Sequence, residues 1–240
     1  MIRFWETNLA TAFLLCAANA ATAQEATNVE FAFLKMSQIC ANSEGAPNIW
    51  RDQAEAAGWT PVKSDLFDDL AEYRTQARLV GIYLAGDANT FPTPITRQAT
   101  KEVFLEQMRT EEAQMEAFKE QGVKLRPRFY KFGEEANLTV NFTLSEVTPG
   151  SGVSQTKQEC VINYAGPDLA SIDEQSRLAT PDISTSHGIY ELAAFGGRNA
   201  AGGVVTVSRT KPIDGEKAAE KFGSDQTIYF YSVTYERGNN

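Results

Sequence analysis

The sequence predicts an α+β fold, in which N-terminal helices pack on one face of a mostly antiparallel C-terminal sheet. Apolar residues recur at helical spacing through the first half of the chain, up to about residue 121. After Gly122 the pattern changes to alternation, as in Leu138, Val140 and Phe142. Helices that come before the strands, and do not alternate with them, are typical of the α+β class.

Two amphipathic helices are expected first, over residues 28–40 and 47–57. In each, the apolar residues share one face, and in the first this face includes Cys40. Gly58 is well placed to end the second helix, because glycine readily adopts the left-handed cap conformation. Trp59 lies between this cap and an extended segment, so we expect its ring to be buried.

The middle of the chain is less regular until its longest helix. Residues 66–70 predict a short helix or turn, and the apolar residues 77–84 fit a helix or a strand. The clearest helix is expected over residues 95–121, where Phe104, Met108 and Phe118 share a face. Methionine on such a stripe can provide an adaptable surface for a partner, although ordinary core packing explains the same pattern.

The second half predicts a series of strands separated by turns and two short helices. The strands are expected over residues 138–145, 158–164, 188–195, 204–208 and 227–236, and the helices over 167–178 and 216–222. The last strand is apolar on both faces. We therefore expect it to be a central strand, or an edge strand that a helix covers.

The N-terminus has the layout of a secretory signal peptide. Arg3 gives it a positive start, residues 9–18 form an uncharged apolar run, and Ala21-Thr22-Ala23 is a cleavage signal. We expect cleavage after Ala23, which leaves residues 24–240 as a single domain in the periplasm or outside the cell. The apolar run is shorter than the roughly 20 residues that span a bilayer, so no membrane span is expected in the mature chain.

Charge disfavours nucleic acid as a partner. The chain has 22 lysines and arginines against 31 acidic residues, a net charge of −9, and an acidic surface repels a phosphate backbone. The densest basic group is Lys124, Arg126, Arg128 and Lys131. In a strand the first three would share one face, which we expect to be solvated.

The cysteines predict one disulfide. Cys16 leaves with the signal peptide, so Cys40 and Cys160 remain. An even number of cysteines in an exported protein favours a bridge, because the compartment is oxidising. The alternative is two separate buried thiols. A bridged cysteine cannot be a nucleophile, so the bridge would remove cysteine-based catalysis.

No pattern in the chain predicts a catalytic, cofactor or metal site. The single histidine, His187, is expected in a surface turn, and Asp182 and Ser186 are its nearest partners for hydrolysis. Zinc sites need several His or Cys ligands, and the calcium-loop and phosphate-loop patterns are absent. We therefore lean towards a protein that is not an enzyme.

Three segments together resemble small exported proteins of alphaproteobacteria. They are residues 33–40, with Phe33-Leu34-Lys35 leading to Cys40; Ala56-Ala57-Gly58-Trp59-Thr60-Pro61-Val62; and Glu159-Cys160-Val161-Ile162-Asn163-Tyr164. The resemblance covers about a quarter of the chain. It implies residence in the periplasm and a cysteine pair, and it implies no activity.

The leading functional hypothesis is a non-catalytic binding or accessory protein with a protein or small-molecule partner. One alternative is a hydrolase that uses carboxylates or an unrecognised serine. Another is an envelope-associated interaction module that docks through the Phe104–Phe118 helix face. A concave apolar pocket with perturbed carboxylates would favour the hydrolase, and a large exposed apolar patch would favour the interaction module.

Overall fold

The computed structural model describes residues 28–42, 47–86, 91–123, 125–134, 136–147, 155–175 and 181–238. The expected signal peptide and Lys124 of the basic group lie outside this part of the chain. Among the described helices, none is both long enough and apolar enough to cross a membrane.

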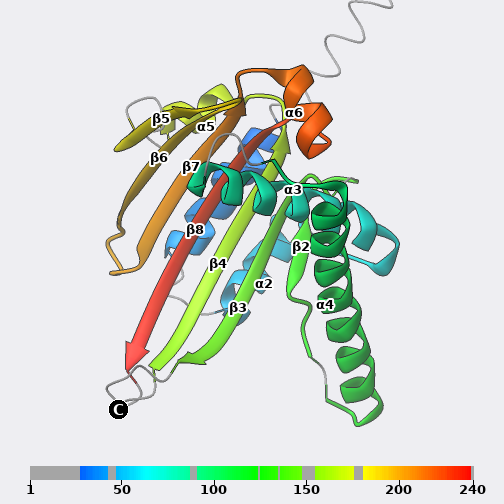
Figure 1. Cartoon of the computed structure of the whole chain (residues 1–240). Helices are drawn as coiled ribbons and strands as arrows, with labels where there is room; N and C mark the ends of the chain where they lie inside the picture. The colour runs from blue at the N-terminus through cyan, green and yellow to red at the C-terminus, as the bar shows by residue number, and fades with distance from the viewer. Residues whose placement is uncertain are drawn as a thin grey trace, which may run out of the picture.

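Eight strands of the described residues form one antiparallel sheet in the order β1-β2-β3-β4-β8-β7-β6-β5 (Figure 1). They are β1 (Thr60–Pro61), β2 (Phe129–Lys131), β3 (Leu138–Val147), β4 (Gln155–Gly166), β5 (Ile183–His187), β6 (Tyr190–Arg198), β7 (Val204–Pro212) and β8 (Thr227–Gly238). β8 pairs with β4 and β7, so it joins two four-stranded meanders. The prediction of a central last strand is confirmed.

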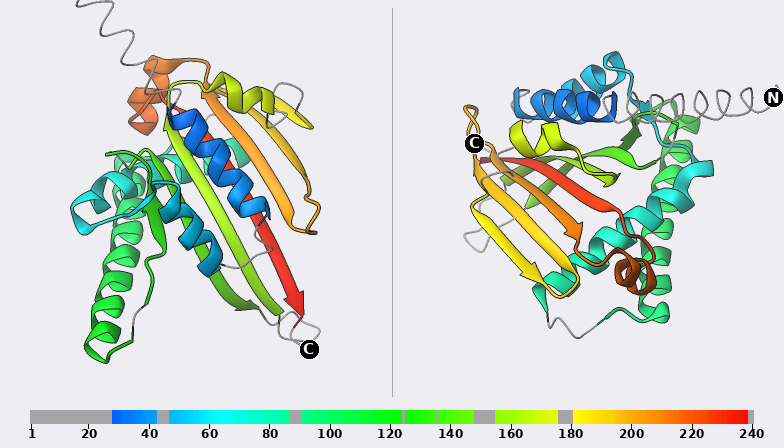
Figure 2. Two further views of the ribbon diagram at one scale, coloured as in Figure 1. Left: turned by 180° about the vertical axis from the view of Figure 1, so that it is seen from behind. Right: turned by 90° about the horizontal axis from the view of Figure 1, so that it is seen from above.

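Helices cover both faces of this sheet (Figure 2). The helix over residues 28–42, α2 (Pro47–Ala56) and α5 (Ala170–Gln175) lie on the face that carries Cys160, the first face. The opposite, second face is crossed by α3 (Phe67–Ala85), with α4 (Pro94–Glu120) beside it and α6 (Gly215–Phe222) at one end. The α+β class is confirmed. The expected layer of helices on one face is present, and a second layer, which was not expected, covers the other face.

The larger core lies on the first face. Phe33, Met36 and Cys40 of the first described helix and Trp50 of α2 are fully buried against alternate strand residues such as Val233. This is the face whose apolar period-two pattern is visible in the sequence. Burial of such large side chains from water is the main force that holds helices to the sheet.

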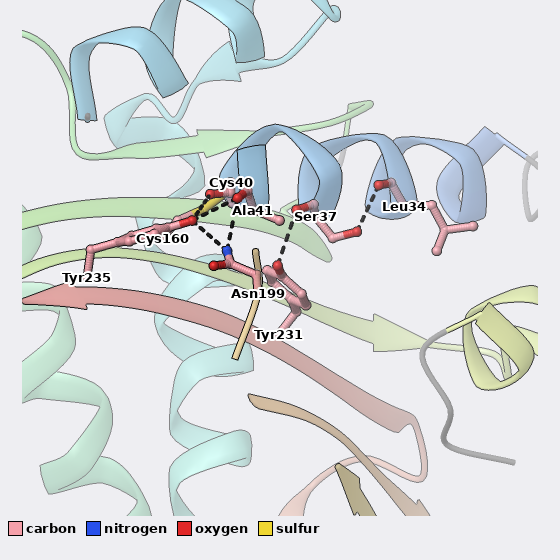
Figure 3. The surroundings of a disulfide bond; sticks show 8 residues. All are labelled: Leu34, Ser37, Cys40, Ala41, Cys160, Asn199, Tyr231 and Tyr235. Carbon is pink, nitrogen blue, oxygen red and sulfur yellow. Dashed lines mark hydrogen bonds between the residues drawn. A yellow bond between two sulfur atoms is a disulfide. The ribbon is translucent and has the colours of Figure 1, made fainter. Parts of the chain in front are cut away.

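The predicted Cys40–Cys160 disulfide is confirmed, and it joins the end of the first described helix to β4, with the two Cα atoms 6.0 Å apart (Figure 3). The last carbonyls of a helix have no partner within it. Here the Tyr235 hydroxyl and the Asn199 amide both donate to the Ala41 carbonyl, at 2.8 and 2.9 Å. The helix end is therefore held to the sheet by a covalent bond and by hydrogen bonds.

Trp59 is buried as expected, with 2% of its surface exposed. It follows Gly58, which has the left-handed φ of +87°. The Trp59 amide donates to the Ala54 carbonyl at 3.0 Å, and its ring centre lies 5.7 Å from that of Phe132. The cap therefore turns the chain so that the indole enters the core.

The structure corrects the prediction for the middle of the chain. Residues 66–70 and 77–84 belong largely to one 19-residue helix, α3. The polar run Arg74-Thr75-Gln76 separates the two apolar parts of this helix, so the sequence pattern predicts two separate elements. Thr75 and Gln76 are nonetheless buried, and Arg74 is half-buried. Tertiary contacts have overridden the local pattern.

Candidate ligand-binding cleft

Two adjoining cavities lie between α3 and the second face of the sheet. Their volumes are about 330 and 410 Å³, and Ala77, Asn163 and Phe230 line both of them. The first lies under the N-terminal half of α3, and the second lies under its C-terminal half. Each volume is in the range of small-molecule sites, and the shared wall makes them one cleft, which we call the α3 cleft.

α3 is held across the sheet by apolar packing near its two ends. Near its start, Leu70 is in a buried cluster with Leu105 and Met108 of α4. Near its other end, Tyr83 packs edge-on against Tyr190 of β6 and Phe222 of α6, with ring centres 6.2 and 5.3 Å apart. The central turns of α3 therefore bridge the strands, and polar residues of the sheet face them.

The strands supply a polar floor to the first cavity. Pairing of β3 with β4 places Asn141 opposite Val161 and Thr143 opposite Glu159 on the second face. Thr143 and Thr234 both donate to the Glu159 carboxylate, at 3.4 Å. The same strands present apolar residues to the opposite face, so one alternating pattern supplies the core and the cleft.

Arg74 is the central cation of the cleft. The carbon atom of its guanidinium lies 4.5 Å from the ring centre of Phe104 and 4.9 Å from that of Phe129, so both aromatic faces attract it. Its Nη1 is buried and has no hydrogen-bond partner, and no carboxylate of the described residues forms an ion pair with it. Burial, and then the charge of Arg128, lower the pKa of Arg74 to about 10. The side chain is therefore charged at neutral pH.

Arg128 lies next to Arg74 at the same cavity. Its Nη1 donates to Glu111 of α4 at 2.6 Å, while its Nε is buried without a partner. The side-chain oxygen of Asn141 is also buried and unpartnered. Most buried polar atoms in folded proteins are hydrogen-bonded. Three unpartnered atoms on residues that line one cavity therefore favour a polar ligand at this place.

The charges around the first cavity favour an anion. Arg74, Arg128 and Glu159 are the charged residues among the described residues that line it. Glu159 has Lys157 at 3.7 Å and Arg128 has Glu111, whereas Arg74 has no paired acid. The cavity therefore has an uncompensated positive charge in a protein whose net charge is −9, and a guanidinium binds carboxylates and phosphates through two parallel hydrogen bonds.

The second cavity has a different character. Its walls are mainly aliphatic or aromatic, from Val80 and Leu84 of α3 and from Leu192, Ile228 and Phe230 of the strands. Gly81 also lines it, and a Cβ atom at this position would meet nothing within 4 Å. The α3 cleft therefore changes from cationic under the start of α3 to apolar under its end.

The residues that the sequence singled out lie elsewhere. Cys160 is on the first face, away from the cleft. His187 is the last residue of β5 and pairs in register with Tyr190, so it lies in a strand and not in the expected surface turn. The side chain of His187 is not among those that the structure describes. Asp182 accepts from the Gly196 amide at 3.4 Å. Within the part of the chain that the structure describes, no three His, Cys, Asp or Glu residues group to hold a metal.

Sequence reasoning missed Arg74 and placed Arg128 on a solvated strand face. The structure corrects the expected solvated strand face, because Arg126 and Arg128 both precede β2 and form ion pairs. Arg126 pairs with Asp52 and Glu55 of α2. Arg128 pairs with Glu111 and lines the first cavity. The sequence did not single out Arg74 as a site residue, because one arginine in a helix is usually solvated. Its position between two phenylalanine rings arises only in the folded chain.

No family model, curated protein or solved structure matches the chain. The resemblance to exported alphaproteobacterial proteins therefore stays a prediction. The α3 cleft and the chemistry of its walls are the features of the described residues that bear on function.

Proposed function

We propose that this is an exported, non-catalytic binding protein that holds a small molecule in the α3 cleft, with an anionic group of the ligand at Arg74. The observation that carries the proposal is the charged Arg74 guanidinium at the cavity wall without an acid partner. A half-buried charge without an acid partner costs stability. Binding of an anion offsets that cost only in the complex, which is typical of a site maintained for function.

The carboxylates near the cleft favour binding over hydrolysis. Glu111 and Glu159 both line a wider cavity of about 1050 Å³ next to the first one. Carboxylate-based hydrolysis needs one acid that keeps its proton and one that is ionised. Glu111 is ion-paired with Arg128, and Glu159 accepts from two threonines and lies near Lys157. Both carboxylates are therefore already held by neighbouring side chains.

Export is part of the proposal, and the Cys40–Cys160 disulfide supports it, because such bridges persist in oxidising compartments. We expect the mature protein to begin at Gln24. Intact-mass measurement of protein recovered from the periplasm or the medium checks this. A mass that includes residues 1–23 would contradict the localisation.

Replacement of Arg74 by methionine is expected to abolish anion binding without loss of stability. Methionine keeps the apolar contact with Phe104 and Phe129 and removes the unpaired charge. We expect the unfolding midpoint to stay the same or rise. The matched control is Arg78→Met, on the same helix, where the side chain is exposed.

The binding test is a calorimetric or NMR titration with butyrate and with inorganic phosphate at millimolar concentration. Loss of a charge-assisted hydrogen bond weakens binding by about tenfold or more. We expect that loss in Arg74→Met and unchanged binding in Arg78→Met. Equal binding by the two variants, or no binding of either anion by the unaltered protein, would refute the α3 cleft as an anion site.

A further inference from the structure

We infer that the ligand is an anionic amphiphile of the fatty-acid class, with its carboxylate at Arg74 and its aliphatic chain in the second cavity. The inference rests on the proposed function and deepens it. It joins two observations that an anion site alone leaves unexplained. These are the apolar character of the second cavity and its shared wall with the first.

Continuity of the cleft is the first step. Ala77, Asn163 and Phe230 line both cavities, so the cavities adjoin beneath α3, and a ligand that extends past these three residues occupies both. Along α3, Arg74 precedes this shared wall, and Val80, Gly81 and Leu84 follow it. A ligand that lies beneath the helix therefore meets the cation first and the apolar side chains next.

The length of the cleft sets the length of the chain. Arg74 and Leu84 are ten positions apart on α3, and a helix rises about 1.5 Å per residue, which gives roughly 15 Å. An extended aliphatic chain of about twelve carbons spans this distance, so a ten-carbon chain fits within it. Its burial against Val80, Ile228 and Phe230 removes apolar surface of both ligand and protein from water.

Charge selects the head group. Arg128 is matched by Glu111, whereas Arg74 is unmatched. One negative charge on the ligand therefore neutralises the cavity. A planar carboxylate fits the fork of a guanidinium and accepts two parallel hydrogen bonds from it. A cationic or neutral head with the same chain lacks this match.

The test is calorimetric titration of the delipidated mature protein with decanoate, below its micelle concentration. Three compounds serve as controls. Butyrate has the same carboxylate but lacks the long chain, and decanol has the same chain but lacks the charge. Decyltrimethylammonium has the same chain and the opposite charge. A buried methylene strengthens binding by up to about fourfold. We therefore expect decanoate to bind one molecule per chain, at least about tenfold more tightly than each of the three.

A variant of the apolar end separates this inference from the proposed function. Gly81→Leu places a side chain at the wall of the second cavity, where a Cβ meets nothing within 4 Å. Leucine also favours a helix more than glycine does, so the fold is retained. We expect decanoate affinity to fall by about tenfold, since several methylenes lose their cavity, while butyrate affinity is unchanged. Gly81→Ala, which adds one methyl group, is the matched control.

Two results would overturn the inference, and the second of them would also overturn the proposed function. If butyrate binds through Arg74 but decanoate is no tighter and Gly81→Leu has no effect, the amphiphile is wrong and the anion site stands. If neither ligand shows a dependence on Arg74, both the amphiphile and the proposed function are wrong.

Discussion

Replacement of Cys40 and Cys160 by alanine is expected to lower the free energy of unfolding by about 2–5 kcal/mol. The bridge closes a loop with a sequence separation of 120, so it strongly restricts the unfolded chain. Both cysteines are fully buried, and alanine leaves no unpaired polar group there. Denaturant titration of the double variant beside the parent protein measures the loss.

The helix that carries Cys40 should nevertheless stay in place in this variant. Tyr235 and Asn199 still hold the Ala41 carbonyl, and Tyr231 donates to the Ser37 carbonyl at 3.2 Å. We expect a native circular dichroism spectrum, and no further effect of reductant on the variant. An unchanged unfolding midpoint, or two free thiols in the denatured and unreduced parent, would show that the bridge does not form.

Trp59→Ala is expected to lower the free energy of unfolding by about 3–5 kcal/mol. The indole is 2% exposed and packs beside Phe132 where α2 meets β1, so alanine leaves a cavity there. Trp59→Phe should cost less, because it keeps most of the ring packing and removes an indole N–H that has no partner.

Ile95→Ala on α4 is the control for this measurement. Ile95 is 82% exposed, and surface substitutions usually change stability by less than about 0.5 kcal/mol. Denaturant midpoints of the three variants should therefore rank Trp59→Ala lowest, Trp59→Phe next and Ile95→Ala close to the parent. A Trp59→Ala midpoint equal to that of Ile95→Ala would contradict the packing described for Trp59.

The elements predicted correctly are those whose own sequence carries a periodic pattern. The helix over residues 28–42, α2, α4 and β3 each present one clear apolar face or alternation, and β8 is a regular strand that is apolar on both faces. The disulfide was predictable for a different reason, since compartment and cysteine number decide it without knowledge of the fold. β2 and β5 were missed because they are short, at three and five residues, and neighbouring strands define them.

The α3 cleft was not predictable, and the reason is physical. Arg74, Asn163 and Phe230 lie far apart in the sequence and meet only because α3 lies across the second face of the sheet. The polar run that divided α3 in the sequence begins with Arg74, which lines the cavity. Local rules fail most often where a residue serves a site, and here the failure of the pattern coincided with the site.

An amide NMR titration of the mature protein with decanoate tests the central claim most directly, because it locates the ligand. The α3 cleft predicts saturable shifts, at one decanoate per chain, that centre on Ala77, Asn163 and Phe230, the wall common to both cavities. The same titration of Arg74→Met should show no saturable change. Shifts that centre on the opposite face around Trp50, or shifts that persist unchanged in Arg74→Met, would contradict the account.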